Sequence, residues 1–72
     1  MNQLWAITHR QTGVRVTGFL KKEITIGASL EILRTDEPGT SMVTSPVVRY
    51  VRIFSKGVEI ATMNSAYILT RI

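Results

Sequence analysis

Cysteine is absent from the sequence, and histidine occurs once, at His9. Disulfides, one of the usual aids to the stability of a small domain, are therefore excluded. A structural zinc site is not expected, because no thiolate is present to complete a tetrahedral ligand set with one imidazole. A chain of 72 residues buries only about 60% of the surface that its unfolded form exposes. Self-association is the aid that remains, and we expect a homo-oligomer.

Long apolar runs are also absent. No stretch approaches the roughly 18 apolar residues of a membrane span. The first ten residues, MNQLWAITHR, contain no basic region followed by an apolar run, so they do not resemble an export signal. We therefore expect a cytoplasmic protein that does not enter a membrane.

Acidic residues are few. Five Asp and Glu stand against nine Lys and Arg, which gives a net charge of +4. A basic surface attracts acidic partners, either an acidic protein surface or a nucleic acid. The same excess of charge also serves solubility alone. The net charge therefore favours an acidic partner but does not distinguish an acidic protein surface from a nucleic acid.

The residues that catalysis needs are scarce. His9 is the one side chain suited to act as a base near neutral pH, and nothing in the spacing pairs it with Ser45 or Ser65 as a nucleophile. The carboxylates are too scattered for a glycosidase pair. The glycines of TGVRVTG and IGASLEI match neither the phosphate loop nor the dinucleotide fingerprint. We expect no enzyme, no catalytic residue, no cofactor and no metal.

The pattern of the remaining sequence is that of β-strands. Glycine or proline interrupts every window long enough for a three-turn helix, and β-branched residues dominate between them. Short alternating segments recur about every 8 to 12 residues, as in small all-β domains. The sequence predicts one domain, residues 1–72. We expect a small antiparallel SH3-like barrel, or a strongly bent sheet, of five to seven short strands.

Turn residues divide these segments. Residues 3–20 are predicted to form a hairpin around Gly13. In residues 24–35, Ile24 and Ile26 share a face, Gly27 breaks the run, and alternation resumes at Leu30 and Ile32. Pro38 and Gly39 suit the second and third positions of a type II turn.

Further turns and the core follow from the second half of the chain. Lys56 and Gly57 are typical of a tight hairpin turn. Pro46 cannot donate a hydrogen bond to a sheet, so it must lie at an edge, a strand start or a bulge. The expected core consists of Trp5, Ile7, Val16, Ile26, Leu30, Ile32, Val51, Ile53 and Leu69.

Two polar clusters precede apolar strands. The TSP cluster contains Thr44 and Ser45, and the NS cluster contains Asn64 and Ser65, two residues before Tyr67. Side chains of these types often bond to nearby backbone and shape bends. If the two bends lie together, they also present donors and acceptors for a small polar ligand or for the backbone of a partner. Both interpretations stay open from sequence alone.

A basic strand follows the TSP cluster. Arg49, Tyr50, Arg52 and Phe54 combine positive charge with aromatic rings, as the stacking platforms of small nucleic-acid-binding barrels do. The alternative is that the aromatic rings belong to the core and that the arginines lie over apolar surface with their heads in water.

The order of motifs resembles a group of small β-rich proteins encoded by phages, prophages and plasmids. The resemblance spans about residues 24–69. It rests on TSPV at residues 44–47, on T-x-N-S-x-Y at residues 62–67, and on the spaced residues Ile24, Gly27, Leu30 and Ile32.

This resemblance implies an accessory protein that acts in the bacterial cytoplasm without catalysis. Such proteins include inhibitors of host defence, which block a host protein or sequester a nucleotide signal. The leading hypothesis is a protein that occludes a host (defence) protein. Nucleic-acid binding is the alternative, and a sponge for a nucleotide second messenger is a third possibility. The expected partner-binding residues are Thr44, Ser45, Asn64, Ser65, Tyr67, Arg49 and Arg52.

Overall fold

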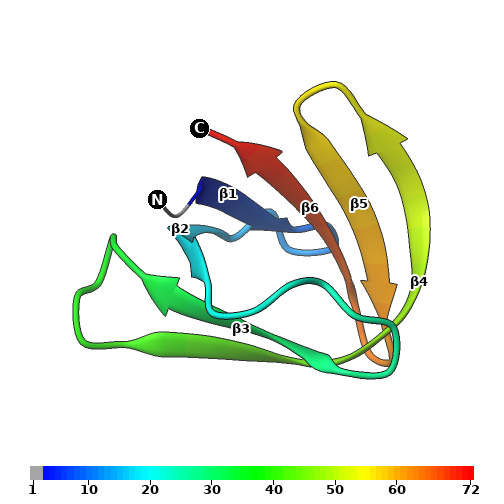
Figure 1. Cartoon of the computed structure of the whole chain (residues 1–72), viewed down its shortest axis with the longest axis horizontal. Coiled ribbons are helices and arrows are strands. Elements are labelled where there is room, and N and C mark those ends of the chain that lie inside the picture. Colours follow the sequence, from blue (N-terminus) through cyan, green and yellow to red (C-terminus); the bar gives the residue numbers. More distant parts are fainter. Residues whose placement is uncertain (1–2) are drawn as a thin grey trace.

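Six β-strands follow one another along the chain of the computed structural model, which describes residues 3–72 (Figure 1). No helix occurs among these residues. The predicted all-β fold and the predicted number of strands are therefore confirmed. The strands are β1 (Leu4–His9), β2 (Arg15–Leu20), β3 (Ser29–Arg34), β4 (Ser41–Phe54), β5 (Gly57–Thr62) and β6 (Ala66–Arg71).

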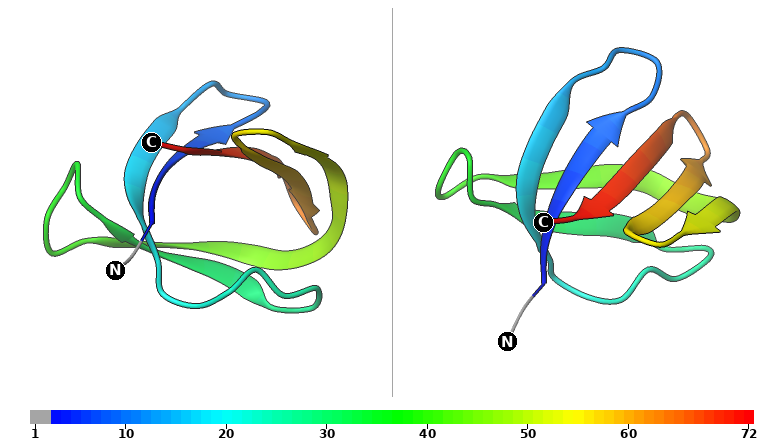
Figure 2. Two further views of the ribbon diagram at one scale, coloured as in Figure 1. Left: turned by 45° about the horizontal axis from the view of Figure 1, so that its top comes forward. Right: turned by 90° about the horizontal axis from the view of Figure 1, so that it is seen from above.

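The strands form a closed antiparallel barrel in which every strand pairs with its neighbours in sequence. The ring closes between β1 and β6, with Trp5 opposite Arg71 and His9 opposite Tyr67. Figure 2 shows how the strands curve around to bring the first and last of them together. Closure gives most backbone groups a partner strand, which a flat sheet of this size could not do at its two edges.

The predicted turns at Gly13 and at Pro38–Gly39 form as the sequence indicates. Gly13 has a φ of 76° and its N–H donates to the carbonyl oxygen of His9 at 2.8 Å, which closes the β1–β2 hairpin. Gly39 has a φ of 86° directly after Pro38. A positive φ at the third position is what a type II turn requires, and glycine adopts it without a steric cost.

The break predicted at Gly27 is confirmed, and a strand forms only after it. Strand β3 starts at Ser29, and the preceding residues form a loop. Gly27 in this loop has a φ of 93°, which interrupts the strand conformation. The loop is held against β4 by backbone bonds from Gly27 to Val47 and from Val47 to Ala28. Alternation of Ile24 and Ile26 was the misleading signal.

Strand β4 is long and changes partner halfway. Residues 41–46 pair with β3, and residues 47–54 pair with β5. Pro46 lies opposite Ser29, next to a register shift in the β3–β4 pairing. Pro46 therefore lies at a bulge, which is one of the three positions expected for it. Beyond Val47, β4 has a partner strand on one side only. We call residues 48–54 the outer half of β4.

The core lies inside the ring. The buried apolar cluster comprises Ile7, Val16, Leu30, Ile32, Val47, Val58, Ile60, Tyr67 and Leu69. The prediction is correct for Ile7, Val16, Leu30, Ile32 and Leu69.

Three of the expected core residues are exposed: Ile26, Val51 and Ile53. Ile26 lies in the loop before β3. In the outer half of β4, register shifts fall between Val47 and Arg49 and between Tyr50 and Arg52. Each shift inserts one residue, Val48 or Val51, and so changes which face the following side chains occupy. Alternation counted from Val47 therefore gives the wrong face only between the two shifts. The second shift restores the phase, so Ile53 lies opposite the buried Val58 but is exposed near the end of the strand.

Candidate functional site

The two polar clusters lie together at one end of the barrel. The Ser45 hydroxyl donates to Oγ1 of Thr62 at 2.8 Å, and it accepts from the backbone N–H of Asn64 at 3.2 Å. The pairing of Val47 with Thr62 produces this arrangement, because it sets the bend of β4 beside the turn between β5 and β6. Ser45 and Asn64 are thus direct neighbours.

Most of the hydroxyl groups in the clusters are already used within the protein. Oγ1 of Thr62 accepts from the backbone N–H of Ser65 and donates to the carbonyl oxygen of Ser65, each at 3.1 Å. Oγ1 of Thr44 accepts from the N–H of Leu30 at 3.0 Å and donates to the carbonyl oxygen of Ser45. Leu30 lies at the β3–β4 register shift, so Thr44 supplies an acceptor where the strand pairing is irregular.

The side chains left free to meet a partner are at the rim. Asn64 is exposed, and its side-chain amide bonds to no residue in the described range 3–72. Met63 beside it is 69% exposed. The clusters therefore combine a fixed interior with an exposed amide and thioether.

His9 extends the polar network to the first hairpin. Its Nδ1 accepts from the backbone N–H of Thr12 at 3.2 Å, so the ring proton is on Nε2 and is donated to Oγ of Ser65 at 3.0 Å. The imidazole also packs edge-on against Tyr67, with the ring centroids 5.1 Å apart. Spacing in the sequence does not indicate this contact, because His9 and Ser65 are 56 residues apart.

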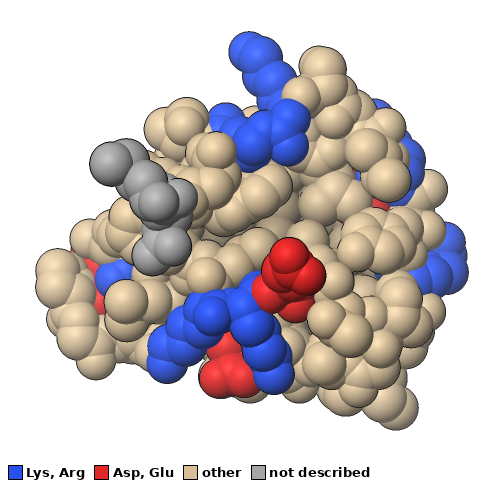
Figure 3. All heavy atoms as spheres, viewed as in Figure 1, with Lys and Arg blue, Asp and Glu red and all other residues tan. Residues whose placement is uncertain are grey.

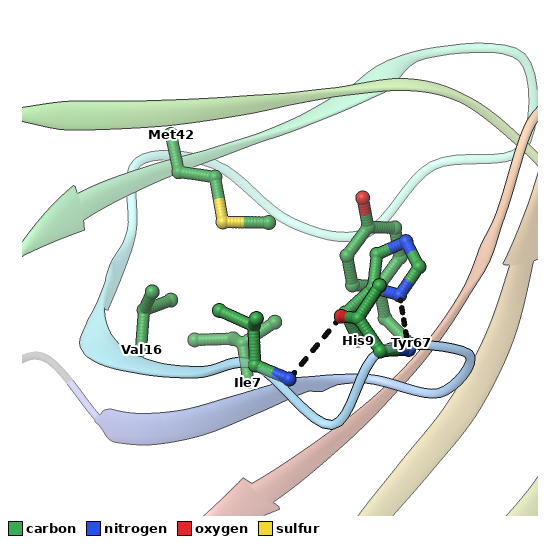
Figure 4. Close-up of a pocket in the computed structure, with 7 residues that line it drawn as sticks. Ile7, His9, Val16, Met42 and Tyr67 are labelled. Carbon is green, nitrogen blue, oxygen red and sulfur yellow. Dashed lines mark hydrogen bonds between the residues drawn. The ribbon is translucent and has the colours of Figure 1, made fainter.

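A hollow opens beside His9 at the mouth of the barrel (Figure 4). It measures about 260 Å³, and residues from the first hairpin, β1, β2, β4 and β6 line it. These residues are Ile7, His9, Thr12, Val14, Val16, Met42 and Tyr67. Tyr67, expected at a binding site, thus lines the hollow, whereas the other lining residues were not expected there.

The outer half of β4 has a different character. Val48, Tyr50, Val51 and Ile53 are exposed along it. Figure 3 shows basic side chains at the right-hand rim, where β4 runs, and a mixed group of basic and acidic side chains over the connection between β2 and β3. The outer half of β4 contains no acidic residue. It is an apolar and basic surface.

The two arginines of this segment differ in their contacts. Arg52 donates from Nε to Oε1 of Glu59 at 2.9 Å, and its guanidinium lies 5.0 Å from the centroid of the Phe54 ring. Arg49 is exposed and forms no ion pair with any residue in the described range. Arg49 is therefore the arginine of the pair that remains available to an external acid.

Tyr50 is separated from Arg52 and Phe54 by one of the β4 bulges. Its hydroxyl donates to the carbonyl oxygen of Ile24 at 3.4 Å, in the loop before β3. The four residues of the nucleic-acid hypothesis thus comprise one free arginine, a tyrosine directed toward a loop, and a phenylalanine ring with an arginine over it.

Among residues 3–72, Glu59 is the charged residue that is buried, with 2% of its side chain exposed. Arg52 and Arg10 bond to its two carboxylate oxygens, one from β4 and the other from the first hairpin. Hydrogen bonds from these two guanidinium groups lower the pKa of Glu59 from its ordinary value of 4.5. The carboxylate therefore stays charged although it is removed from water.

Among residues 3–72, no three His, Cys, Asp or Glu side chains gather in a way that could hold a metal ion. In that same described part of the chain, no helix is long and apolar enough to cross a membrane.

No protein-family model matches the sequence, and comparisons with curated proteins and with solved structures give no match either. The chemistry of the site therefore has to be inferred from its own geometry.

Proposed function

We propose that this protein binds another protein, without catalysing a reaction, through the outer half of β4. The observation that carries the proposal is a row of exposed apolar side chains on a strand segment that has a partner strand on one side only. Ile53, for example, is 78% exposed. A group of large exposed apolar side chains within one short segment is typical of a protein interaction site.

The charge of the segment defines the partner. Arg49 is exposed and unpaired within the described range, and no acidic side chain occurs in residues 48–54. An acidic surface with apolar side chains at its centre complements such a segment. Arg52 plays a smaller part, because Glu59 already neutralises it.

The polar clusters contribute at the border of this surface. Asn64 offers an exposed amide, while Thr44 and Ser45 hold the bend from which the outer half of β4 departs. Ser65 fixes His9, and through it the wall of the hollow that Tyr67 also lines. In this proposal the clusters position the surface and Asn64 extends it.

The resemblance of TSPV and T-x-N-S-x-Y to proteins of phages, prophages and plasmids supplies the setting. The partner is then a protein of the bacterial host, such as a component of a defence system. The protein acts by covering a surface that the host component needs. We expect it to do so as a homo-oligomer in the cytoplasm.

A pull-down from bacterial lysate tests the proposal with two matched variants. Arg49→Glu combined with Ile53→Asp places negative charge on the outer half of β4. Arg15→Glu combined with Val43→Asp makes the same changes at exposed positions elsewhere. We expect the first variant to lose at least 90% of a captured protein that the wild type and the second variant retain.

Three readings complete this experiment. Circular dichroism must show both variants folded. A lysine substitution in the acidic surface of the captured protein should restore part of its binding to the first variant, because the charges are then opposite again. Equal capture by all three proteins, or equal loss in both variants, would contradict a role for the outer half of β4. Sedimentation measures the solution mass alongside, and it shows whether the segment joins copies of the chain instead.

Nucleic-acid binding is the second candidate, and one observation favours it: Tyr50 is 43% exposed between two arginines. Against it, the guanidinium of Arg52 lies over the Phe54 ring, and the hydroxyl of Tyr50 is bonded to the carbonyl oxygen of Ile24. An oligonucleotide titration decides the matter. Binding whose affinity falls steeply with added salt would support this candidate over protein binding.

A further inference from the structure

The hollow at the barrel mouth is deep enough to reach the core. Its floor is formed by Ile7 and Val16, which are 1% and 7% exposed. Met42 faces them across the hollow, as Figure 4 shows. Val14 lies at the edge and is largely exposed. A small molecule in this space would thus touch apolar side chains on several sides, as ligands at the mouths of barrels commonly do.

Tyr67 gives the hollow a polar group. The residue is 8% exposed, yet its hydroxyl bonds to no residue in the described part of the chain. No described side-chain oxygen or nitrogen is both cut off from solvent and unpartnered. The Tyr67 hydroxyl is therefore open to solvent, and it can donate or accept one hydrogen bond with a molecule in the hollow that the residue lines.

The wall around Tyr67 is rigid. The imidazole of His9 is fixed by bonds to Thr12 and Ser65, and its plane is inclined by 85° to the Tyr67 ring. Both aromatic side chains are thus held in place before any ligand arrives. A wall that is already ordered spares the ligand the entropic cost of ordering it.

We propose that the hollow binds a small neutral aromatic molecule with one hydrogen-bonding group, of the phenol or indole class. The ring lies over the floor of Ile7 and Val16, against the more exposed side chains of Val14 and Met42, and its polar group meets the hydroxyl of Tyr67. No Lys, Arg, Asp or Glu side chain lines the hollow, so a phosphate or carboxylate would find no counter-charge. A volume of about 260 Å³ is below that of sites for drug-sized ligands and suits about ten non-hydrogen atoms.

This site is independent of the outer half of β4, because the two share no residue. Ligand binding at the hollow and protein binding at the strand can each fail while the other holds.

Titrations followed by two-dimensional amide NMR test the proposal with four probes. Indole and 4-methylphenol have the ring and the polar group, toluene has the ring alone, and benzoate adds a charge. We expect Kd values of about 1 mM for the first two, as befits ligands of this size, and no binding of benzoate. The amide signals that move should be those of His9, Val14, Met42 and Tyr67, and not those of Val51 and Ile53.

Two variants separate the hydrogen bond from the cavity. Tyr67→Phe removes only the hydroxyl, so it should weaken indole and 4-methylphenol by about fivefold to tenfold and leave toluene unchanged. Val14→Trp fills the mouth from an exposed position, so it should abolish binding of all three, while the amide spectrum reports that the fold is intact. The proposal is overturned if the wild type shows no shifts at 10 mM probe, a concentration about tenfold above the expected Kd. It is also overturned if the shifts lie outside the hollow, or if Tyr67→Phe weakens toluene as much as indole.

Discussion

Glu59 is a buried carboxylate on β5, between the buried apolar side chains of Val58 and Ile60. Removing a charge from water is costly unless partners replace the lost hydration. Arg10 and Arg52 do so from two different parts of the chain, so the carboxylate ties the first hairpin to β4 across the outside of the barrel. The stability that these two ion pairs contribute therefore depends on the charge of Glu59.

Acid should therefore destabilise the protein through Glu59. Its pKa is lower in the folded than in the unfolded state, so the folded protein binds this proton more weakly. The stabilisation is complete above pH 4.5, the ordinary pKa, and is lost as the pH falls through the lower pKa of the folded state. We expect the midpoint of thermal unfolding to fall more steeply below pH 4.5 in the wild type than in Glu59→Gln.

The controls follow from the contacts of the other carboxyl groups. Glu59→Gln should be less stable than the wild type at pH 7, because its arginines lose their partner. Arg34 also lowers the pKa of Asp36, so protonation of Asp36 destabilises the wild type and Glu59→Gln equally. Its contribution therefore cancels when the two proteins are compared. Glu23→Gln changes an exposed carboxyl outside the ion pairs of the described range and should behave as the wild type. Parallel acid curves for Glu59→Gln and the wild type would show that the arginine contacts contribute nothing.

At the scale of the elements, the bend of β4 and the turn before β6 are joined by the hydroxyl of Ser45. This hydroxyl is at once a donor to Thr62 and an acceptor from Asn64. The side chain of Asn64, by contrast, is exposed and bonds to no described residue. The side chain of Ser45 thus holds the fold together, whereas the side chain of Asn64 does not.

Substitution separates these two contributions. Ser45→Ala should lower the free energy of unfolding by about 1 to 2 kcal/mol, because it removes the part-buried hydrogen bond to Thr62 and the exposed one from the backbone N–H of Asn64. Asn64→Ala should change it by less than about 0.5 kcal/mol, as surface substitutions usually do. Urea denaturation followed by circular dichroism measures both values. If Asn64→Ala were as destabilising as Ser45→Ala, the amide would be structural and would leave the proposed binding surface.

The elements themselves were largely predictable, since alternation and turn residues act locally. The Pro38–Gly39 turn and the first hairpin depend on a few adjacent residues, and they form as expected. Gly57 was placed in a turn, but it is the first residue of β5. A Cβ there would lie 1.8 Å from the carbonyl oxygen of Leu69. Glycine is needed because β6 passes close by, and local sequence does not reveal such an approach.

The site was predictable only in part. The TSP and NS clusters stand out as polar interruptions, but their contact depends on the pairing of β4 with β5. The hollow joins side chains from Ile7 to Tyr67, and no pattern within one segment indicates it. The difference between Arg49 and Arg52 rests on Glu59, which lies on another strand.

At the scale of the whole molecule, the closed barrel cannot be divided into units that would fold independently. Every strand pairs with two others, and β1 depends on β6 at the far end of the chain. Loss of one strand would therefore expose core residues of both its neighbours. A small domain built in this way should unfold in a single cooperative step.

Trp5 provides a test of this cooperativity. It is the one tryptophan, and it lies on β1 opposite Arg71, whose guanidinium is 5.8 Å from the centroid of its ring. We expect the fluorescence of Trp5 and the far-ultraviolet circular dichroism to give coincident urea unfolding curves. A fluorescence change that precedes the loss of circular dichroism would show instead that the β1–β6 closure opens first.

The two bulges in the outer half of β4, at Val48 and Val51, have a consequence for the behaviour of the protein at high concentration. An apolar strand with an unpaired edge is the ordinary template for amyloid, in which copies stack flat and in register about 4.8 Å apart. Bulges bend and twist the strand, so that a second copy cannot continue the stack. The segment can thus remain apolar for a partner without seeding fibrils.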